Sequence, residues 1–203
     1  MTKNETQETI RNRRSIRGLL GPELSEKELY TLIELAVLAP APHHTQPWRF
    51  AHIPQNKRSN LATAMGKAWE KDLIQDGIKN DQIAKLLQRS SQEIKNVPTL
   101  LLGCLVNEGL NQYVDDRRNT AEWGLALHSF GAALENILLA ASSMNIGAYW
   151  ISAPLYAPNE VRASLDLDDA WKPQALIALG RIDPSYSPFK RQRSDIKKYL
   201  IFC

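Results

Sequence analysis

The amino-acid sequence predicts an α+β fold, because patterns typical of helices and of strands follow one another without regular alternation. Residues 99–106 form a near-continuous apolar run, which is typical of a strand covered on both faces. Residues 120–144 carry a long helical pattern that is apolar nearly all round. A chain of 203 residues can bury one sizeable core, so we expect residues 1–203 to form a single domain.

Composition excludes several classes of function. The formal net charge of +3 is too close to balance to attract a nucleic-acid backbone or an anionic membrane over long range. Residues 1–10 are polar, unlike a secretory signal, and the apolar stretch 124–141 is interrupted by polar side chains, unlike a membrane span. Cys104 and Cys203 make neither a disulfide framework nor a metal-binding pair. We therefore expect a cytoplasmic protein with no nucleic-acid or membrane partner.

The first half of the chain predicts three elements after a short N-terminal helix and a Gly-Pro turn. Ser25 followed by Glu28 is a capping box, and the apolar spacing behind it predicts a helix over residues 25–39, ended by the following prolines. Residues 48–53 suit a strand with Phe50 on one face and Arg49 on the other. Residues 55–92 indicate mostly helix, polar and peripheral.

The second half begins with the two apolar segments named above, a central strand and a buried helix. We then expect a left-handed stop at residues 145–147, a short strand at 148–152, a brief helix at 158–165 and a last core strand at 174–180. The chain ends in an apolar run at residues 199–202. A tail this apolar is expected to be docked.

Two basic clusters are candidates for holding an anion. The first contains Arg13, Arg14, Ser15 and Arg17, which can supply charge-assisted, forked hydrogen bonds to a phosphate or a polarised carbonyl. The second contains Arg191 and Arg193, which share one side if the segment is extended. Each cluster by itself is also typical of a solvated surface.

Residues 40–50 form an unusual segment in which three prolines stiffen a loop. A stiff loop loses little entropy on ordering and is suited to clamp a planar ligand, although a rigid connector would use the same residues. His43 and His44 do not indicate a metal site, because adjacent residues rarely point at one ion and no carboxylate or cysteine stands nearby. We expect no metal.

The sequence shows no pattern typical of a catalytic side chain. His128 is expected to be a core or interface histidine, and the sequence has no nucleophile elbow, no suitable carboxylate pair and no activated cysteine. It also lacks the glycine patterns of Rossmann and P-loop nucleotide sites. If the protein is an enzyme, a cofactor is expected to carry the reaction.

Four motifs together resemble the nitroreductase-like flavoproteins: Arg-Arg-Ser-Ile-Arg at 13–17, the proline and histidine loop at 39–50, Ser-Phe-Gly-Ala-Ala-Leu-Glu-Asn at 129–136, and Tyr-Trp-Ile-Ser at 149–152. The sequence is most similar to the flavin-binding C-terminal domain of coenzyme F-420 gamma-glutamyl ligases, without the ligase domain. The resemblance implies a nitroreductase-like fold, with a mainly antiparallel sheet flanked by helices. It also implies an intertwined homodimer with flavin mononucleotide (FMN) at the subunit interface.

The resemblance also assigns roles to the basic clusters. Arg13 and Ser15 match positions that hold the phosphate and nearby ribityl oxygens of FMN, with Arg14 between them also expected to bind the cofactor. Arg191 and Arg193 match the pair that completes the phosphate site. Arg17 matches the cation at the N1/O2 edge of the ring. A fixed guanidinium there would stabilise the negative charge of the reduced ring.

The two remaining motifs are expected to meet the ring itself. Pro40, Ala41, Pro42 and His44 match the loop that reaches the flavin from the partner subunit, with His44 where many relatives have asparagine.

Ile151, Ser152 and Ala153 match the turn whose backbone N–H faces flavin N5, without the acidic residue that many nitroreductases place there. We expect the backbone near Ser152 and Ala153 to serve the chemistry at N5.

The function implied is transfer of a hydride from NAD(P)H through flavin N5 to a small conjugated acceptor such as a nitroaromatic, quinone or enone. Two alternatives stay open. One is a reductase of the deazaflavin (coenzyme F-420) pathway, and the other is a flavin- or deazaflavin-binding protein without turnover.

Overall fold

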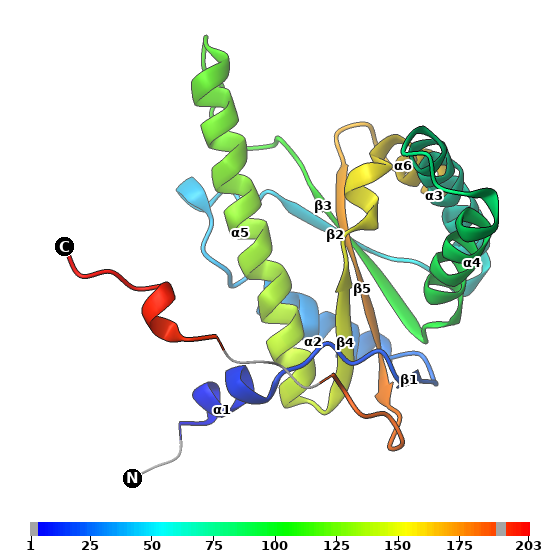
Figure 1. The fold of residues 1–203 in the computed structure, drawn as a ribbon. Helices are drawn as coiled ribbons and strands as arrows, with labels where there is room; N and C mark the ends of the chain where they lie inside the picture. Colours follow the sequence, from blue (N-terminus) through cyan, green and yellow to red (C-terminus); the bar gives the residue numbers. More distant parts are fainter. Residues whose placement is uncertain (1–3, 190–193) are drawn as a thin grey trace.

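The computed structural model describes residues 4–189 and 194–203, and its centre is a five-stranded sheet (Figure 1). Strand β5 pairs with β1, β3 and β4, and β3 also pairs with β2; every pairing is antiparallel. The strands are β1 (Leu19–Leu20), β2 (Trp48–His52), β3 (Thr99–Leu105), β4 (Ile146–Ile151) and β5 (Lys172–Ile182). The predicted α+β class with a mainly antiparallel sheet is confirmed.

Helices cover both faces of the sheet (Figure 1). One face packs against α2 (Glu26–Ala36) and α5 (Asp116–Ser143), and the other against α3 (Gln55–Gln75), α4 (Asn80–Asn96) and α6 (Pro158–Leu165). Helix α1 (Glu5–Asn12) contacts α5. Three short 3-10 turns complete the fold: η1 (Pro42–His44), η2 (Ala153–Tyr156) and η3 (Ile196–Lys198).

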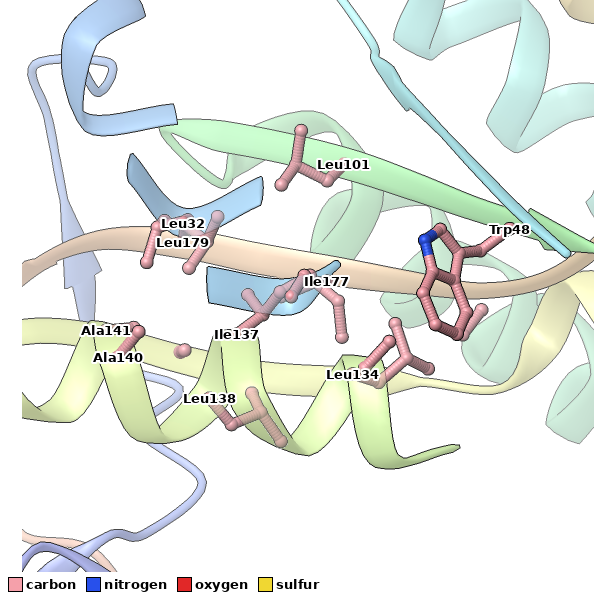
Figure 2. Packing of buried hydrophobic residues seen from close by; sticks show 14 of the residues in the cluster. Leu32, Trp48, Leu101, Leu134, Ile137, Leu138, Ala140, Ala141, Ile177 and Leu179 are labelled. Carbon is pink, nitrogen blue, oxygen red and sulfur yellow. The ribbon is translucent and has the colours of Figure 1, made fainter. Parts of the chain in front are cut away.

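The central strand β3 lies where its apolar run predicts, with all seven residues buried. Its side chains alternate, so Leu101 joins the core under α2 and α5 while Leu100 and Leu102 join the core under α3, α4 and α6. Figure 2 shows how Leu134 and Ile137 of α5 pack toward the strands in the first of these cores. Burying one such side chain contributes about 1.5–3 kcal/mol, so the two-sided strand anchors the fold.

Helix α2 begins as predicted. The Ser25 hydroxyl accepts a hydrogen bond from the Glu28 backbone N–H, and the Glu28 carboxylate accepts one from the Ser25 N–H. Glu28 also accepts a 2.7 Å hydrogen bond from Arg181. The bonds from Ser25 first, and then the contact with Arg181, lower the pKa of Glu28 to about 2. The helix ends at Ala36, earlier than the predicted residue 39, and turns lead from there to Pro40.

Residues 55–92 are mostly helix, as predicted, and form two helices, α3 and α4, which pack on each other. The break contains Gly77, whose φ of 74° lies in the left-handed region that favours glycine. A single glycine in a polar helical stretch is a weak signal for such a break.

The sequence predicted that the helix at residues 120–144 is buried. In the structure only one face of this helix, α5, is buried. Gly124 and Gly131 face open space, where an added Cβ would meet nothing within 4 Å. By length and composition α5 is apolar enough to span a membrane, a test that core helices of soluble proteins also pass, and half of its most apolar window is buried. The left-handed stop after it is confirmed at Asn145, with φ 56°.

The smaller elements of the second half agree with the sequence. Helix α6 has the predicted bounds, and β4 and β5 are each longer than predicted. The apolar tail is the exception, because it is not docked on the chain that carries it. Side chains Tyr199 to Phe202 are 55–88% exposed, and the tail runs away from the core (Figure 1).

Candidate active site

The first basic cluster runs along the open edge of β4. The Ile16 N–H donates a 3.0 Å hydrogen bond to the Ala148 carbonyl, which holds residues 13–17 beside the strand. The predicted N5 turn, residues 151–153, follows the same strand. Two segments far apart in the sequence therefore meet at one edge of the sheet.

Arg17 is half exposed and has two neighbours at this edge. Its guanidinium lies 5.3 Å from the centroid of the Tyr149 ring, and its Nε lies 4.0 Å from a carboxylate oxygen of Glu93 on α4. Burial first, and then the charge of Glu93, raise the pKa of Tyr149 well above its usual range. Tyr149 therefore stays neutral, as an aromatic surface under the cation.

The other two arginines of the cluster are engaged within the chain. The Arg13 side chain is 15% exposed, with its Nε 3.0 Å from the Glu135 carboxylate on α5. The Arg14 guanidinium donates to the carbonyls of Arg11 and Arg13, both at 2.8 Å, and lines a polar cavity of about 410 Å³. Ser15 is exposed. The cluster therefore presents Ser15 and Arg17 to solvent most openly.

The turn after β4 presents backbone donors. Ser152 has φ −88° and ψ 4°, in the sparsely populated bridge region where active-site residues are often found. Its carbonyl accepts from the Leu155 N–H at 3.1 Å. Within residues 4–189 and 194–203, the N–H groups of Ser152 and Ala153 have no hydrogen-bond partner. They are available to an acceptor atom outside the chain.

The proline and histidine loop is ordered but lies elsewhere. His43, His44 and Gln46 all have positive φ, between 47° and 56°. For residues other than glycine this conformation costs about 1 kcal/mol each. The loop packs on α5, on the side of that helix away from β4 (Figure 1). One chain therefore does not bring Pro40, Ala41, Pro42 and His44 to Arg17.

The remaining predictions concern the C-terminal basic pair, His128, Cys104 and a metal site. Arg191 and Arg193 lie outside the described residues. His128 is exposed on α5, so the expectation of a core histidine is wrong and that of an interface histidine is not tested. Burial raises the pKa of the Cys104 thiol to about 12, which keeps it protonated and unreactive. In the part of the chain that the structure describes, no group of histidine, cysteine and acidic residues could hold a metal.

Sequence reasoning missed two arrangements of charged residues. Glu93 lies in a polar helix that gave no sign of proximity to Arg17. Arg58, fully buried, donates to the carbonyls of Ile53, Val97 and Pro98, and lies 3.6 Å from Glu23. These bonds tie α3 to the ends of β2 and α4, and a lone arginine in a polar helix carries no signal for such a role.

A second hollow, of about 730 Å³, lies between α2 and β2. Apolar residues, among them Leu29, Ile33 and Trp48, form most of its lining, and the Glu23 and Glu26 carboxylates lie among them. No basic cluster of the β4 edge lines it. It is therefore separate from the candidate active site.

Comparison with known proteins identifies the family of the chain and proteins similar to it. Residues 10–181 match the model of the Nitroreductase family. The chain is 26% identical over 189 residues to YfhC of Bacillus subtilis strain 168, whose name places it among the NAD(P)H nitroreductases; the match covers 93% of this chain and 89% of YfhC.

Two crystal structures share the fold. One is a nitroreductase-type protein from Desulfovibrio desulfuricans in complex with FMN, with TM-score 0.75, 22% identity and 99% and 98% of the two chains covered. The other is the FMN-dependent nitroreductase NfnB from Mycobacterium smegmatis in complex with NADPH, with TM-score 0.74, 18% identity and 98% of each chain covered. At these identities the likeness establishes the fold, and the predicted nitroreductase-like fold is confirmed.

Proposed function

Because the chain belongs to the Nitroreductase family and is an oxidoreductase, we propose that it transfers a hydride from NAD(P)H to a small conjugated acceptor, with FMN as its cofactor. The observation that carries this proposal is the edge of β4. There, free backbone N–H groups of Ser152 and Ala153 follow the strand that Arg17 and Ser15 lie beside. Complexes of structural relatives with FMN and with NADPH support it.

The residues present fit a flavin. Ser152 and Ala153 offer N–H donors to a ring nitrogen, Arg17 offers a cation to the ring oxygens, and Ser15 offers a hydroxyl to the ribityl or phosphate oxygens. Arg13 offers its Nη groups to the phosphate while its Nε stays with Glu135. Arg14, Arg191 and Arg193 complete the proposed phosphate site.

These donors and this cation support hydride transfer through a bound flavin. When bound, FMN would supply the hydride chemistry: NAD(P)H would give up a hydride, two electrons with one proton, and leave as NAD(P)⁺, and the acceptor would gain that hydride and a proton from solvent. The Arg17 guanidinium stabilises negative charge at the N1/O2 edge, and the N–H groups of residues 152 and 153 orient the reacting edge. No side chain of the turn needs to exchange a proton, which agrees with the absence of an acidic residue there.

We propose that two copies of the chain form the complete site. The loop containing Pro40, Ala41, Pro42 and His44 lies apart from Arg17 within one chain, so it would reach the flavin of a partner. The open faces of Gly124 and Gly131 support close approach of a second helix to α5. The exposed apolar tail, residues 199–202, supports a larger interface, because such side chains gain about 25 cal/mol per Å² when covered.

The acceptor is proposed to be a nitroaromatic, quinone or enone, because a conjugated acceptor can lie parallel to the ring. The likeness to the C-terminal domain of coenzyme F-420 gamma-glutamyl ligases keeps a reductase of the deazaflavin pathway as the second candidate. A flavin-binding protein without turnover is the third, favoured by the absence of an acidic side chain at residues 151–153. The single domain over residues 1–203 and the cytoplasmic location also stay predictions.

Visible spectroscopy of the purified protein tests the cofactor. We expect flavin absorption bands, release of FMN on acid treatment, and rapid bleaching when NADH or NADPH is added without oxygen. A bound flavin that stays oxidised would favour the binding protein. A colourless protein that takes up no added FMN would contradict the whole proposal.

A further inference from the structure

Three side chains from three separate segments meet beside the proposed flavin edge. Arg17 comes from the N-terminal segment, Tyr149 from β4 and Glu93 from α4. The Arg17 guanidinium lies over the Tyr149 ring at 5.3 Å from its centroid, and the Glu93 carboxylate lies 4.0 Å from Arg17 Nε. The charge of Glu93 also contributes to raising the pKa of Tyr149, after burial. Arg17 therefore has the aromatic ring and the carboxylate as its two neighbours.

The burial of the three members differs in a way that defines their roles. Tyr149 is only 3% exposed, so its ring is a fixed platform. The side chains of Arg17 and Glu93 are 57% and 36% exposed. The fixed ring and the carboxylate together limit where the guanidinium can go. A surface ion pair without such a platform would have no fixed direction.

From this arrangement we infer that the negative charge of Glu93 sets how strongly Arg17 stabilises the reduced flavin. This inference rests on the proposed function. Arg17 is the cation proposed to face the N1/O2 edge, where negative charge accumulates on reduction. A carboxylate beside that cation cancels part of its field, so it shifts the equilibrium toward the oxidised flavin.

The Tyr149 platform decides which of two opposing effects dominates when Glu93 is neutralised. Loss of the ion pair frees Arg17 to move, which would weaken its contact with the flavin. The ring under Arg17 remains, however, and a cation over an aromatic face is attracted without any carboxylate. Arg17 therefore stays in place, and the loss of the opposing charge dominates.

Glu93→Gln tests this directly, because glutamine has nearly the same shape and no charge. We expect the ratio of reduced to oxidised flavin, at equilibrium with a redox dye of known potential, to rise about fivefold. This is the effect of one charge in a half-exposed site. Glu93→Asp, which restores the charge, should return the ratio most of the way to that of the wild type. High salt should shrink the difference between Glu93→Gln and the wild type.

Glu70→Gln, at an exposed position of α3, is the matched control for loss of one carboxylate and should leave the ratio unchanged. If Glu93→Gln binds FMN but has the wild-type ratio or a lower one, the inference is wrong while the proposed function stands. If the wild type binds no FMN, the proposed function fails first. Glu93→Ala, with the same expected direction, replaces the glutamine variant if that one does not fold.

Discussion

The sequence indicated two candidate regions, the segments that meet at the edge of β4 and the proline and histidine loop. The structure shows that only the first region is assembled within one chain. The β4 edge is assembled within one chain, where a backbone hydrogen bond from Ile16 to Ala148 joins the N-terminal segment to the strand. The loop lies on the far side of α5 and keeps three non-glycine residues at positive φ. A motif thus marks a segment as special, but it does not say whether the segment works in its own chain or in a partner.

The sharpest test of the β4 edge is removal of its backbone donor. Ser152→Pro deletes the N–H group at a φ of −88°, close to the range that proline allows. We expect the rate of flavin reduction by NAD(P)H to fall about 100-fold, as for loss of one preorganised donor elsewhere. Stopped-flow absorbance without oxygen measures it. Ser152→Ala keeps the N–H group and should stay near the wild-type rate; an equal loss in both variants would contradict the role of the backbone.

Removal of the cation gives the next largest effect. Arg17→Gln should weaken FMN binding about 10- to 100-fold, the range for loss of a hydrogen bond to a charged group. Quenching of FMN fluorescence on titration measures the dissociation constant. Arg118→Gln is a close control, because Arg118 also pairs with a carboxylate, Asp115, and lies 4.8 Å from the centroid of the Tyr113 ring. Equal affinity in Arg17→Gln and wild type would remove Arg17 from the site.

The loop should show a smaller effect that depends on the partner. Pro42→Gly loosens the loop, so FMN affinity should fall about fivefold, the cost of about 1 kcal/mol of lost preorganisation. Pro54→Gly, which loosens the chain before α3, should bind FMN as the wild type does. Mixing Pro42→Gly with Arg17→Gln chains should restore one wild-type site in each mixed dimer. Failure of such mixtures to regain any tight binding would contradict a shared site.

The smallest effect concerns α2, the helix that leads into the loop. The pKa of Glu28 is depressed to about 2, so its stabilising bonds with Ser25 and Arg181 are fully present above its unfolded value near 4.5 and are lost as the pH falls toward 2. Glu28→Ala should cost about 1 kcal/mol at pH 7 and progressively less below pH 4.5. Urea unfolding at several pH values measures it. A constant difference down to pH 2.5 would contradict the assignment.

Local patterns predicted most of the secondary structure. The capping box of Ser25 and Glu28 fixed the start of α2, and the apolar run of β3 identified the central strand, because capping bonds and two-sided burial leave their mark within a few residues. The break between α3 and α4 was not predicted, since Gly77 alone does not distinguish a kink from a continuous helix. The sequence left open whether all faces of α5 are covered by its own chain or whether one face meets another chain, because an apolar helix suits both.

The candidate site divides in the same way. Arg17, Ser152 and Ala153 follow from motifs, and so does the family to which the chain belongs. Glu93 does not, because its position beside Arg17 depends on how α4 packs against the sheet, and no residue near Glu93 in the sequence records that contact. Sequence alone determined which short segments are candidates for the chemistry, since backbone preference and residue type are local properties. Only the tertiary structure decided which charges face one another, because the Coulomb interaction depends on distance in space and not along the chain.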